Sequence, residues 1–461
     1  MDNLRKSSYL IAIPLGEQKE KYMFIQGYTG AIDIVNSSLK EYLVNQPKIN
    51  KDSFPYSKQI LDKLIERGYI TSKSINEERE YIKKISRIFH NRDKQYIKSF
   101  TLLVTYNCNF KCPYCFEKEE LKKGNNDFSW VINKEMVDNF FNVISVIEPN
   151  ENLRNKTINL FGGEPLLEKN EKIIEYIIRR GSIDGYSFTA TSNGYDMDHY
   201  ERLIKEKLIQ GIQITIDGTK LIHNSRRIHI INGDSFDKII KNIKMALNYG
   251  IHISIRINVD KDNANEIVKL NSFFKETGFY SYKNFSAYAV YISGELNFNP
   301  NNYNESTGYG LSQKDFLNIL ESSKIEITHN QQLYYRLYDA ISKNKAISLS
   351  PCHCSAQSSS YVFDPFGYIY SCPEIVGEKN KSIGTYYNGL VWTKEKEKWF
   401  SRDISIIEKC SKCKYALICG GGCFTKAQLN NKNSDSYCDA FPIVLKAIAN
   451  KIYSHNVVRI K

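Results

Sequence analysis

Three cysteines near residue 110 are spaced so that they could hold a metal centre. They are Cys108, Cys112 and Cys115, and an aromatic residue, Tyr114, precedes the last of them. Three thiolates on one loop can ligate three irons of a cubane cluster and leave its fourth iron open. A zinc site normally needs another protein ligand nearby, yet the next histidine in the chain is His199. The spacing therefore favours an iron-sulfur cluster with one open iron.

Eight further cysteines lie between residues 352 and 438. A disulfide framework is one alternative, but long chains with close Cys-x2-Cys spacings more often bind metal or carry out redox chemistry. Zinc bound between Cys410 and Cys423 is a second alternative, because the spacing there is that of a zinc ribbon. The eight residues are Cys352, Cys354, Cys372, Cys410, Cys413, Cys419, Cys423 and Cys438.

From residue 99 onward, apolar runs alternate with amphipathic stretches. The pattern predicts helices such as 136–146 and 239–249 between strands. This alternation indicates an α/β fold with a parallel sheet covered by helices, either open or closed into a partial barrel. The chemistry of such folds lies at the carboxyl ends of the strands, and the first cysteine loop follows the first strand. The strands are expected at 100–104, 157–161, 186–191, 212–216, 253–259 and 285–290.

Other polar residues follow the later strands. Glycines at 162 and 163 would permit close backbone approach, and Glu164 could accept a hydrogen bond from an ammonium group. Arg227 could pair with a carboxylate, although a surface ion pair is equally compatible with the sequence. Asp217 could instead shape a turn. The candidates at the strand ends are Gly162, Gly163, Glu164, Asn193, Thr215, Asp217 and Arg227, with Arg256 and Asn258 on a later strand.

These motifs resemble those of the radical S-adenosylmethionine (SAM) superfamily. The resemblance includes the three-cysteine loop, the Gly-Gly-Glu-Pro segment from Gly162, and the Thr-Asn-Gly loop that Ser192 interrupts here. It also includes Thr215 to Gly218 and the following His223 and Arg227. The resemblance implies that the first three cysteines hold a 4Fe-4S cluster, and that the candidates at the strand ends bind SAM.

The later cysteines match the seven-cysteine SPASM extension of the same superfamily in order and spacing. The resemblance implies two auxiliary 4Fe-4S clusters, and so three clusters in all. Cys352 is the spare cysteine, and we favour full ligation because unmatched thiols are rare in such sites; otherwise an open iron could bind a substrate thiolate. The implied ligands are Cys410, Cys413, Cys419 and Cys438 for the distal cluster, and Cys354, Cys372 and Cys423 for the nearer one.

Four regions are expected along the chain. Residues 1–97 combine hairpin strands, short helices and a charged linker helix at 75–96, and they resemble the winged-helix-like, leader-binding domain of peptide maturases. A simple cap on the catalytic domain is the alternative. Residues 98–295 would form a partial (β/α)6 barrel. Residues 296–350 would be a connector with a long loop at 297–310, and residues 351–461 the SPASM domain.

The formal net charge is +12, but basic and acidic residues are mixed along the chain. No basic block accompanies the charge, so no nucleic acid is expected. An acidic peptide, or an acidic electron donor of the flavodoxin or ferredoxin type, fits that field better. No apolar run is long enough to span a membrane, and no signal peptide is recognisable, so a cytoplasmic location is expected.

The resemblance implies a peptide maturase in which a 5'-deoxyadenosyl radical abstracts hydrogen from a ribosomally made precursor. Two auxiliary clusters suit a net oxidation, such as a thioether or carbon-carbon crosslink. An anaerobic sulfatase-maturating enzyme is the main alternative, although Pro373 stands where that family places an aspartate after the cysteine. A maturase of a quinone cofactor or small molecule is a further alternative. No catalytic acid or base is assigned.

Overall fold

The computed structural model describes residues 4–16, 18–117, 131–292, 316, 328–329, 332–429, 436–438 and 441–457. The loop expected at 297–310 lies outside these residues. The chain divides into two compact units. The first comprises residues 1–94, 331–358 and 401–461, and the second comprises residues 95–330 and 359–400. Among the described residues, the first unit contains a three-stranded sheet and the second an eleven-stranded sheet.

The larger sheet contains six parallel strands that follow one another in chain order. They lie where the sequence predicts them and confirm an α/β fold with a mostly parallel sheet, as in a partial barrel. The strands are β6 (Ser99–Thr105), β7 (Thr157–Gly162), β8 (Ser187–Ser192), β9 (Ile209–Thr215), β10 (His252–Val259) and β11 (Phe285–Tyr291).

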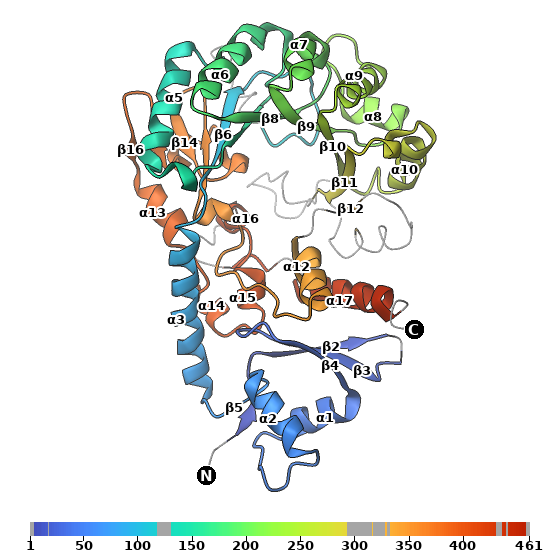
Figure 1. Ribbon diagram of the computed structural model, residues 1–461, viewed down its shortest axis with the longest axis vertical. Coiled ribbons are helices and arrows are strands. Elements are labelled where there is room, and N and C mark those ends of the chain that lie inside the picture. The colour runs from blue at the N-terminus through green and yellow to red at the C-terminus, as the bar shows by residue number, and fades with distance from the viewer. Residues whose placement is uncertain are drawn as a thin grey trace. The chain divides into compact units, whose positions relative to one another are not determined.

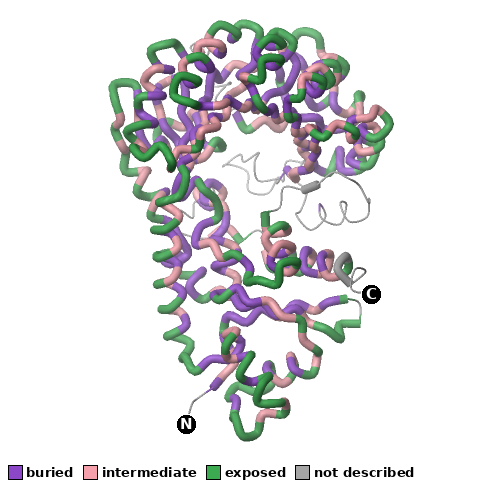
Figure 2. Tube along the Cα trace, in the orientation of Figure 1, coloured by how far each residue is buried: buried purple, intermediate pink, exposed green. Residues whose placement is uncertain are grey.

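Helices cover the outer side of these strands (Figure 1). Their inward faces are apolar; in α5, for example, Phe140 and Phe141 are buried. Figure 2 shows the same division, with buried strands and exposed outer helix faces. The helices are α5 (Lys134–Ile147), α6 (Glu171–Ile183), α7 (Glu201–Lys205), α8 (Lys220–Arg226), α9 (Phe236–Asn248) and α10 (Glu266–Glu276).

Strands from later in the chain extend this sheet at both ends. β12 (Thr328–His329) pairs with β11, and β13 (Ser360–Phe363) runs parallel to β6. Three short antiparallel strands complete the order, namely β14 (Tyr368–Tyr370), β15 (Gly384–Thr385) and β16 (Val391–Trp392), before α13 (Lys394–Ser401). The rings of Phe140 and Phe363 lie 4.8 Å apart, so these added strands share the core of the sheet.

In the first unit, β2 (Leu10–Leu15), β3 (Lys21–Gln26) and β4 (Ile32–Asn36) form an antiparallel sheet. The hairpin strands predicted within residues 1–97 are present, and Gly30 in the turn between β3 and β4 has a φ of +75°. Asn36 caps α1 (Ser37–Asn45) by accepting a hydrogen bond from the Leu39 N–H. The unit also contains α2 (Lys58–Glu66) and a two-stranded pairing of β1 (Arg5–Lys6) with β5 (Ile70–Thr71).

The cysteine-rich segments of the first unit share a hydrophobic core with turn and helix residues of its N-terminal region. Tyr9, Ile82, Cys410 and Leu417 belong to this cluster. Among the described residues, no helix is both long and apolar enough to cross a membrane. The remaining helices of this unit are α3 (Ile75–Asp93), α12 (Gln332–Ser342), α14 (Glu408–Ser411), α15 (Ala416–Cys419), α16 (Phe424–Leu429) and α17 (Phe441–Val457).

Candidate functional site

The first cysteine loop lies at the carboxyl end of β6, in the second unit. Cys112 is buried, Cys108 and Cys115 are half-buried, and none of the three forms a disulfide bond with a described residue. The loop is held to the segment after α8 by backbone hydrogen bonds. The Lys111 N–H donates to the Ile228 carbonyl over 2.9 Å, and the Ile230 N–H donates to the Asn109 carbonyl over 2.9 Å.

Asn109 and His229 position this loop, and neither was recognised from the sequence. The amide of Asn109 donates to Asp196 over 3.0 Å, and its oxygen accepts from the Asn193 side chain over 2.7 Å. The His229 ring stacks on Tyr195 with 4.2 Å between centroids. No local spacing marks either residue, because the partners come from loops far along the chain.

Gly162 and Gly163 bring the end of β7 against the first cysteine loop. A Cβ on Gly162, which has a φ of +141°, would lie 2.3 Å from the Thr105 carbonyl oxygen. A Cβ on Gly163 would lie 2.5 Å from the Asn107 carbonyl oxygen. Only glycine fits such an approach without displacing the backbone. The two glycines therefore permit the close backbone approach that the sequence predicts. In this structure the approach is to the backbone of Thr105 and Asn107.

Glu164 is buried, and its carboxylate accepts three hydrogen bonds from its own chain. Oε1 accepts from the Ser192 hydroxyl over 2.7 Å and from the Leu166 N–H over 2.9 Å. Oε2 accepts from the Asn193 N–H over 2.5 Å. Burial raises the pKa of Glu164 to about 7, although the three donors act in the opposite direction. The side chain thus joins the loops after β7 and β8, and its contact with an ammonium group stays a prediction.

The other candidates near these strand ends also lie in the second unit. The side-chain oxygen of Asn193 accepts from the Tyr195 N–H over 2.9 Å, so this residue orders its own loop. Thr215 is buried at the end of β9, beside Arg256 of β10 in the sheet. The side chain of Arg256 donates to Asn258 over 2.9 Å. Asn193 and Thr215 therefore stay candidates for SAM binding.

A buried polar network centres on Tyr114, the aromatic residue of the cysteine loop. Its hydroxyl donates to Oδ2 of Asp217, and Arg227 Nη1 donates to the Tyr114 oxygen over 2.8 Å. Oδ1 of Asp217 accepts from the Asn258 N–H over 3.1 Å. Arg226 lies 3.6 Å from Asp217 Oδ2. Asp217 therefore orients the cysteine loop through Tyr114, rather than only shaping a turn.

Arg227 is buried beside the cysteines, and among the described residues its Nε has no hydrogen-bond partner. Burial acts to lower the pKa of Arg227, but Cys112, Tyr114 and Asp217 hold it well above its ordinary value. His223, by contrast, shares a hydrogen bond of 3.1 Å with the hydroxyl of Ser235. That hydroxyl donates to the Arg227 carbonyl over 2.9 Å. His223 therefore supports the backbone at Arg227 through Ser235.

The residues at this end of the sheet fit the groups that the sequence implies. Three thiols on one loop suit a cubane cluster with three protein ligands. The buried guanidinium of Arg227, with an unused donor, suits an anionic group such as a carboxylate. The loops carrying Gly163 and Glu164 lie directly against the cysteine loop.

The four cysteines expected around the distal auxiliary cluster line one cavity in the first unit. The cavity has a volume of about 110 Å³. Burial raises the pKa of Cys410 to about 12 and that of Cys419 to about 11. Four thiols around one space form the donor set of a cluster ligated entirely by cysteine. The cysteines are Cys410, Cys413, Cys419 and Cys438, and the apolar walls include Tyr415, Phe441 and Pro442.

The cysteines expected at the nearer cluster are divided between the two units. Cys352, Cys354 and Cys423 belong to the first unit, and Cys372 belongs to the second. Cys352 is buried, and its thiol donates to the Arg402 carbonyl over 3.5 Å. The ligand set of this cluster, including Cys352, stays a prediction.

Comparison with known proteins identifies one domain of this chain. Residues 102–274 match the model of the radical SAM superfamily. The cysteine-type anaerobic sulfatase-maturating enzyme of Clostridium novyi (strain NT) is 24% identical over 75% of this chain and 94% of its own length.

Two solved structures share the fold. Native anSMEcpe with bound AdoMet superposes with a TM-score of 0.56 and 22% identity, covering 79% of this chain and all of its own. SuiB of Streptococcus suis, bound to its precursor peptide SuiA, gives a TM-score of 0.50 and 15% identity. That match covers 94% of this chain and 98% of SuiB. The matched domain makes this chain a radical SAM enzyme that uses S-adenosylmethionine, and its sequence is similar to that of anaerobic sulfatase-maturating enzymes.

Proposed function

We propose that this enzyme matures a ribosomally made precursor peptide by an oxidative crosslink, either a thioether or a carbon-carbon bond. SAM bound at a reduced 4Fe-4S cluster supplies a 5'-deoxyadenosyl radical, which can take hydrogen from an unactivated C–H bond. Cys108, Cys112 and Cys115 would hold that cluster. The residues proposed to surround SAM are Gly162, Gly163, Glu164, Asn193, Thr215, Asp217 and Arg227.

The observation that supports a peptide substrate is the open edge of the small sheet. β4 pairs only with β3, and among the described residues no strand adds to its outer edge. The opposite edge strand, β2, packs against α17, where the Asn450 amide donates to the Pro14 carbonyl over 3.1 Å. An exposed edge offers a row of unpaired backbone groups, to which an extended peptide can add as a strand.

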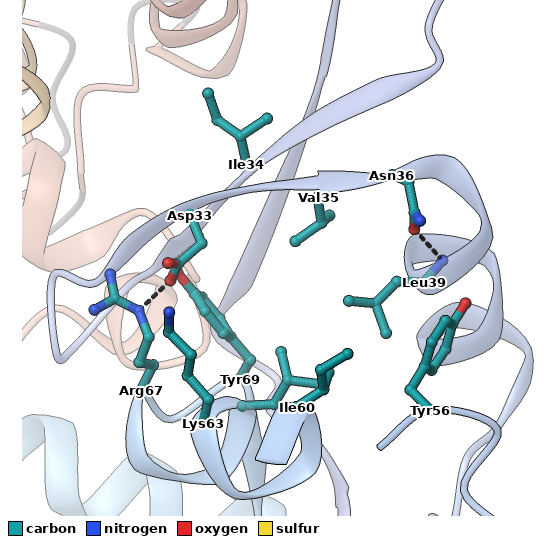
Figure 3. A pocket seen from close by; sticks show the side chains of 11 residues that line it. Asp33, Ile34, Val35, Asn36, Leu39, Tyr56, Ile60, Lys63, Arg67 and Tyr69 are labelled. Atoms are coloured by element: carbon teal, nitrogen blue, oxygen red, sulfur yellow. Dashed lines mark hydrogen bonds and ion pairs between the residues drawn. The ribbon is translucent and has the colours of Figure 1, made fainter. Parts of the chain in front are cut away.

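A groove beside this edge could receive the side chains of such a peptide (Figure 3). Its volume is about 320 Å³. Val35 of β4 points into the groove, whereas Ile34 points away, as the alternation of a strand requires. Ile60 of α2 is 40% exposed there, although it is apolar. The apolar lining includes Val35, Leu39, Tyr56, Ile60, Leu64 and Tyr69.

The charge at one end of the groove favours an acidic residue in the peptide. Arg67 forms an ion pair with Asp33, which also accepts from the Tyr69 hydroxyl over 2.7 Å. Lys63 lines the same end, and it makes no ion pair with any described residue. An apolar residue followed by an acidic one would therefore suit the groove.

The proposed crosslink removes two hydrogens from the peptide. One leaves as an atom taken by the radical, and the other leaves as a proton together with one electron. That electron needs an acceptor. The four thiols around the distal cavity could hold an auxiliary cluster for this purpose, so this donor set supports an oxidation.

Formylglycine formation on a sulfatase is the second candidate, because the Clostridium novyi relative matches over 94% of its length. Its product would be chemically different. Oxidation of a cysteine to formylglycine exchanges sulfur for oxygen and removes two hydrogens, whereas a crosslink removes two hydrogens and keeps the sulfur. Pro373 is the departure from that family that counts against this candidate.

Co-expression with a short peptide encoded beside the gene, without oxygen, tests the proposal by high-resolution mass spectrometry. We expect a loss of two hydrogens per event. Resistance of the product to thiol alkylation would then distinguish a thioether from a carbon-carbon bond. An unchanged peptide mass, with SAM cleavage still occurring, would contradict crosslinking of that peptide. Exchange of sulfur for oxygen in a cysteine peptide would support the second candidate.

A pair of charge-reversal variants tests the groove. Lys63→Glu should weaken peptide binding about tenfold, which corresponds to about 1.4 kcal/mol. Lys58→Glu on the same helix is the control, because Lys58 does not line the groove. Equal peptide affinities for the two variants would argue against binding at β4.

A further inference from the structure

Arg402 is a buried arginine of the first unit that lies among the predicted auxiliary ligands. Only 2% of the residue is exposed. Nη1 donates to the Gly422 carbonyl and Nη2 to the Gly421 carbonyl, each over 3.3 Å. The guanidinium also lies over the ring of Phe424, with 4.8 Å to its centroid. A buried cation that makes these contacts is held in one place.

The two carbonyls belong to a turn that connects cysteines of different predicted clusters. Gly420, Gly421 and Gly422 stand between Cys419 and Cys423, and their φ angles are +74°, +80° and +75°. Three successive left-handed residues are accessible only to glycine at low energy. The Gly421 carbonyl also accepts from the Tyr437 N–H over 3.1 Å, so the Arg402 side chain and the Tyr437 backbone both stabilise the turn.

The turn is pressed against the other cysteine-bearing segments. A Cβ on Gly420 would lie 2.3 Å from the Cys352 carbonyl oxygen, and a Cβ on Gly422 would lie 1.8 Å from the Tyr437 carbonyl oxygen. Tyr437 directly precedes Cys438. The segments of both predicted clusters therefore meet at this turn.

The backbone of Arg402 also contacts the segment that carries Cys352. Its carbonyl accepts from the Cys352 thiol over 3.5 Å and from the Gln357 amide over 2.8 Å. Burial lowers the pKa of Arg402, and four nearby thiols oppose that effect. The thiols are those of Cys410, Cys352, Cys423 and Cys354, which include members of both predicted ligand sets.

We propose that Arg402 is a positioning residue that places a positive charge between the two auxiliary clusters and raises their reduction potentials. A cubane with four thiolates becomes more negative on reduction, so a fixed cation stabilises the reduced state more than the oxidised state. Arg402 would thereby favour transfer of the substrate electron to these clusters. The inference rests on the auxiliary clusters of the proposed function, but not on its peptide substrate.

The test uses the full chain with Cys108, Cys112 and Cys115 replaced by alanine, so that only auxiliary clusters give a signal. Arg402→Gln, Arg402→Lys and the control Arg154→Gln are reconstituted without oxygen, and iron content and midpoint potentials are measured by EPR-monitored titration. Arg154 is a matched control because it also donates to two carbonyls, those of Glu148 and Pro149.

Arg402→Gln should make reduction at least tenfold less favourable, which is a fall of 59 mV for one electron. Arg402→Lys keeps the charge and should change the equilibrium less than threefold, and Arg154→Gln should leave it unchanged. If Arg402→Gln does not retain iron, Arg402→Lys with full iron and a near-native midpoint would still support the proposal.

Several outcomes would overturn this role of Arg402. They are an unshifted midpoint in iron-replete Arg402→Gln, an equal shift in the lysine and glutamine variants, and loss of iron in both. The first two of these outcomes would leave the proposal of peptide crosslinking standing, because mass spectrometry tests that proposal separately. Absence of any cluster in the parent protein would overturn the auxiliary clusters themselves.

Discussion

The Ser192 hydroxyl donates a hydrogen bond of 2.7 Å to Oε1 of Glu164. This bond joins the carboxyl ends of β7 and β8, and the Asn193 N–H strengthens the link through Oε2. Glu164 directly follows the two glycines that lie against the first cysteine loop, and its N–H donates to the Asn107 carbonyl of that loop. One buried acid therefore ties together the loops on which we place SAM binding.

Glu164→Gln should weaken this connection. An amide has only one acceptor oxygen, so at least one of the three donors around the side chain would face an NH2 group. A buried donor left without an acceptor costs about 1–3 kcal/mol. We expect a lower melting temperature and less 5'-deoxyadenosine formed per unit time. Glu168→Gln, at an exposed position nearby, is the control, and equal behaviour of the two variants would refute this role of Glu164.

Tyr114→Phe should disturb the first cysteine loop. The variant removes the hydroxyl that links Asp217 to Arg227, at a cost of about 1–3 kcal/mol in the free energy of unfolding. We expect reduced SAM cleavage at full iron content. Tyr176→Phe is a matched control, because its hydroxyl donates to Asp138 over 2.9 Å on the outer helices. If Tyr114→Phe cleaves SAM at the wild-type rate, the network is not needed to orient the loop.

Cysteine replacements should separate the clusters. Cys112→Ala should lower the iron content by about four atoms and abolish 5'-deoxyadenosine formation, because the first cluster is lost. Cys413→Ala should also remove about four irons but leave SAM cleavage intact, while peptide oxidation fails. Iron analysis and product assays on the same samples measure both effects. Full iron in Cys413→Ala would show that the distal cavity holds no cluster.

Asp364 should make stability depend on pH. Burial raises the pKa of this carboxyl from 3.8 to about 7, against hydrogen bonds from the Tyr368 N–H, the Tyr106 hydroxyl and the Phe366 N–H. Between these values the folded state binds more protons than the unfolded state, so stability falls as pH rises from about 4 to about 7. The loss is at most about 1.4 kcal/mol for each unit of pKa difference.

Asp364→Asn removes this titration while keeping an oxygen for the two backbone donors. The melting temperature of the variant relative to wild type should therefore rise between pH 5 and pH 8. Asp138→Asn is the control for replacing a carboxylate by an amide, since that side chain is 43% exposed. Parallel curves for wild type and Asp364→Asn would contradict the elevated pKa.

Local patterns predicted much of the fold. The six parallel strands, the hairpin around Gly30 and helices such as α9 lie where the spacing of apolar and turn residues predicts them. That spacing is imposed by which residues of one element face the core, so it can be read from a short window. Partners across long separations leave no such signal. The parallel pairing of β13 with β6, and the support of the cysteine loop by His229, were therefore not predicted.

The amino-acid sequence by itself determined the donor chemistry, because the cysteine spacings reveal ligand loops without reference to the rest of the chain. Tertiary structure alone decided how the polar candidates are used. It directs Glu164 and Asp217 to donors of their own chain, gathers Cys410 and Cys438 around one cavity, and buries Arg402 among the thiols. These relationships depend on which distant segments pack together, and burial then determines the strength of each charge and hydrogen bond.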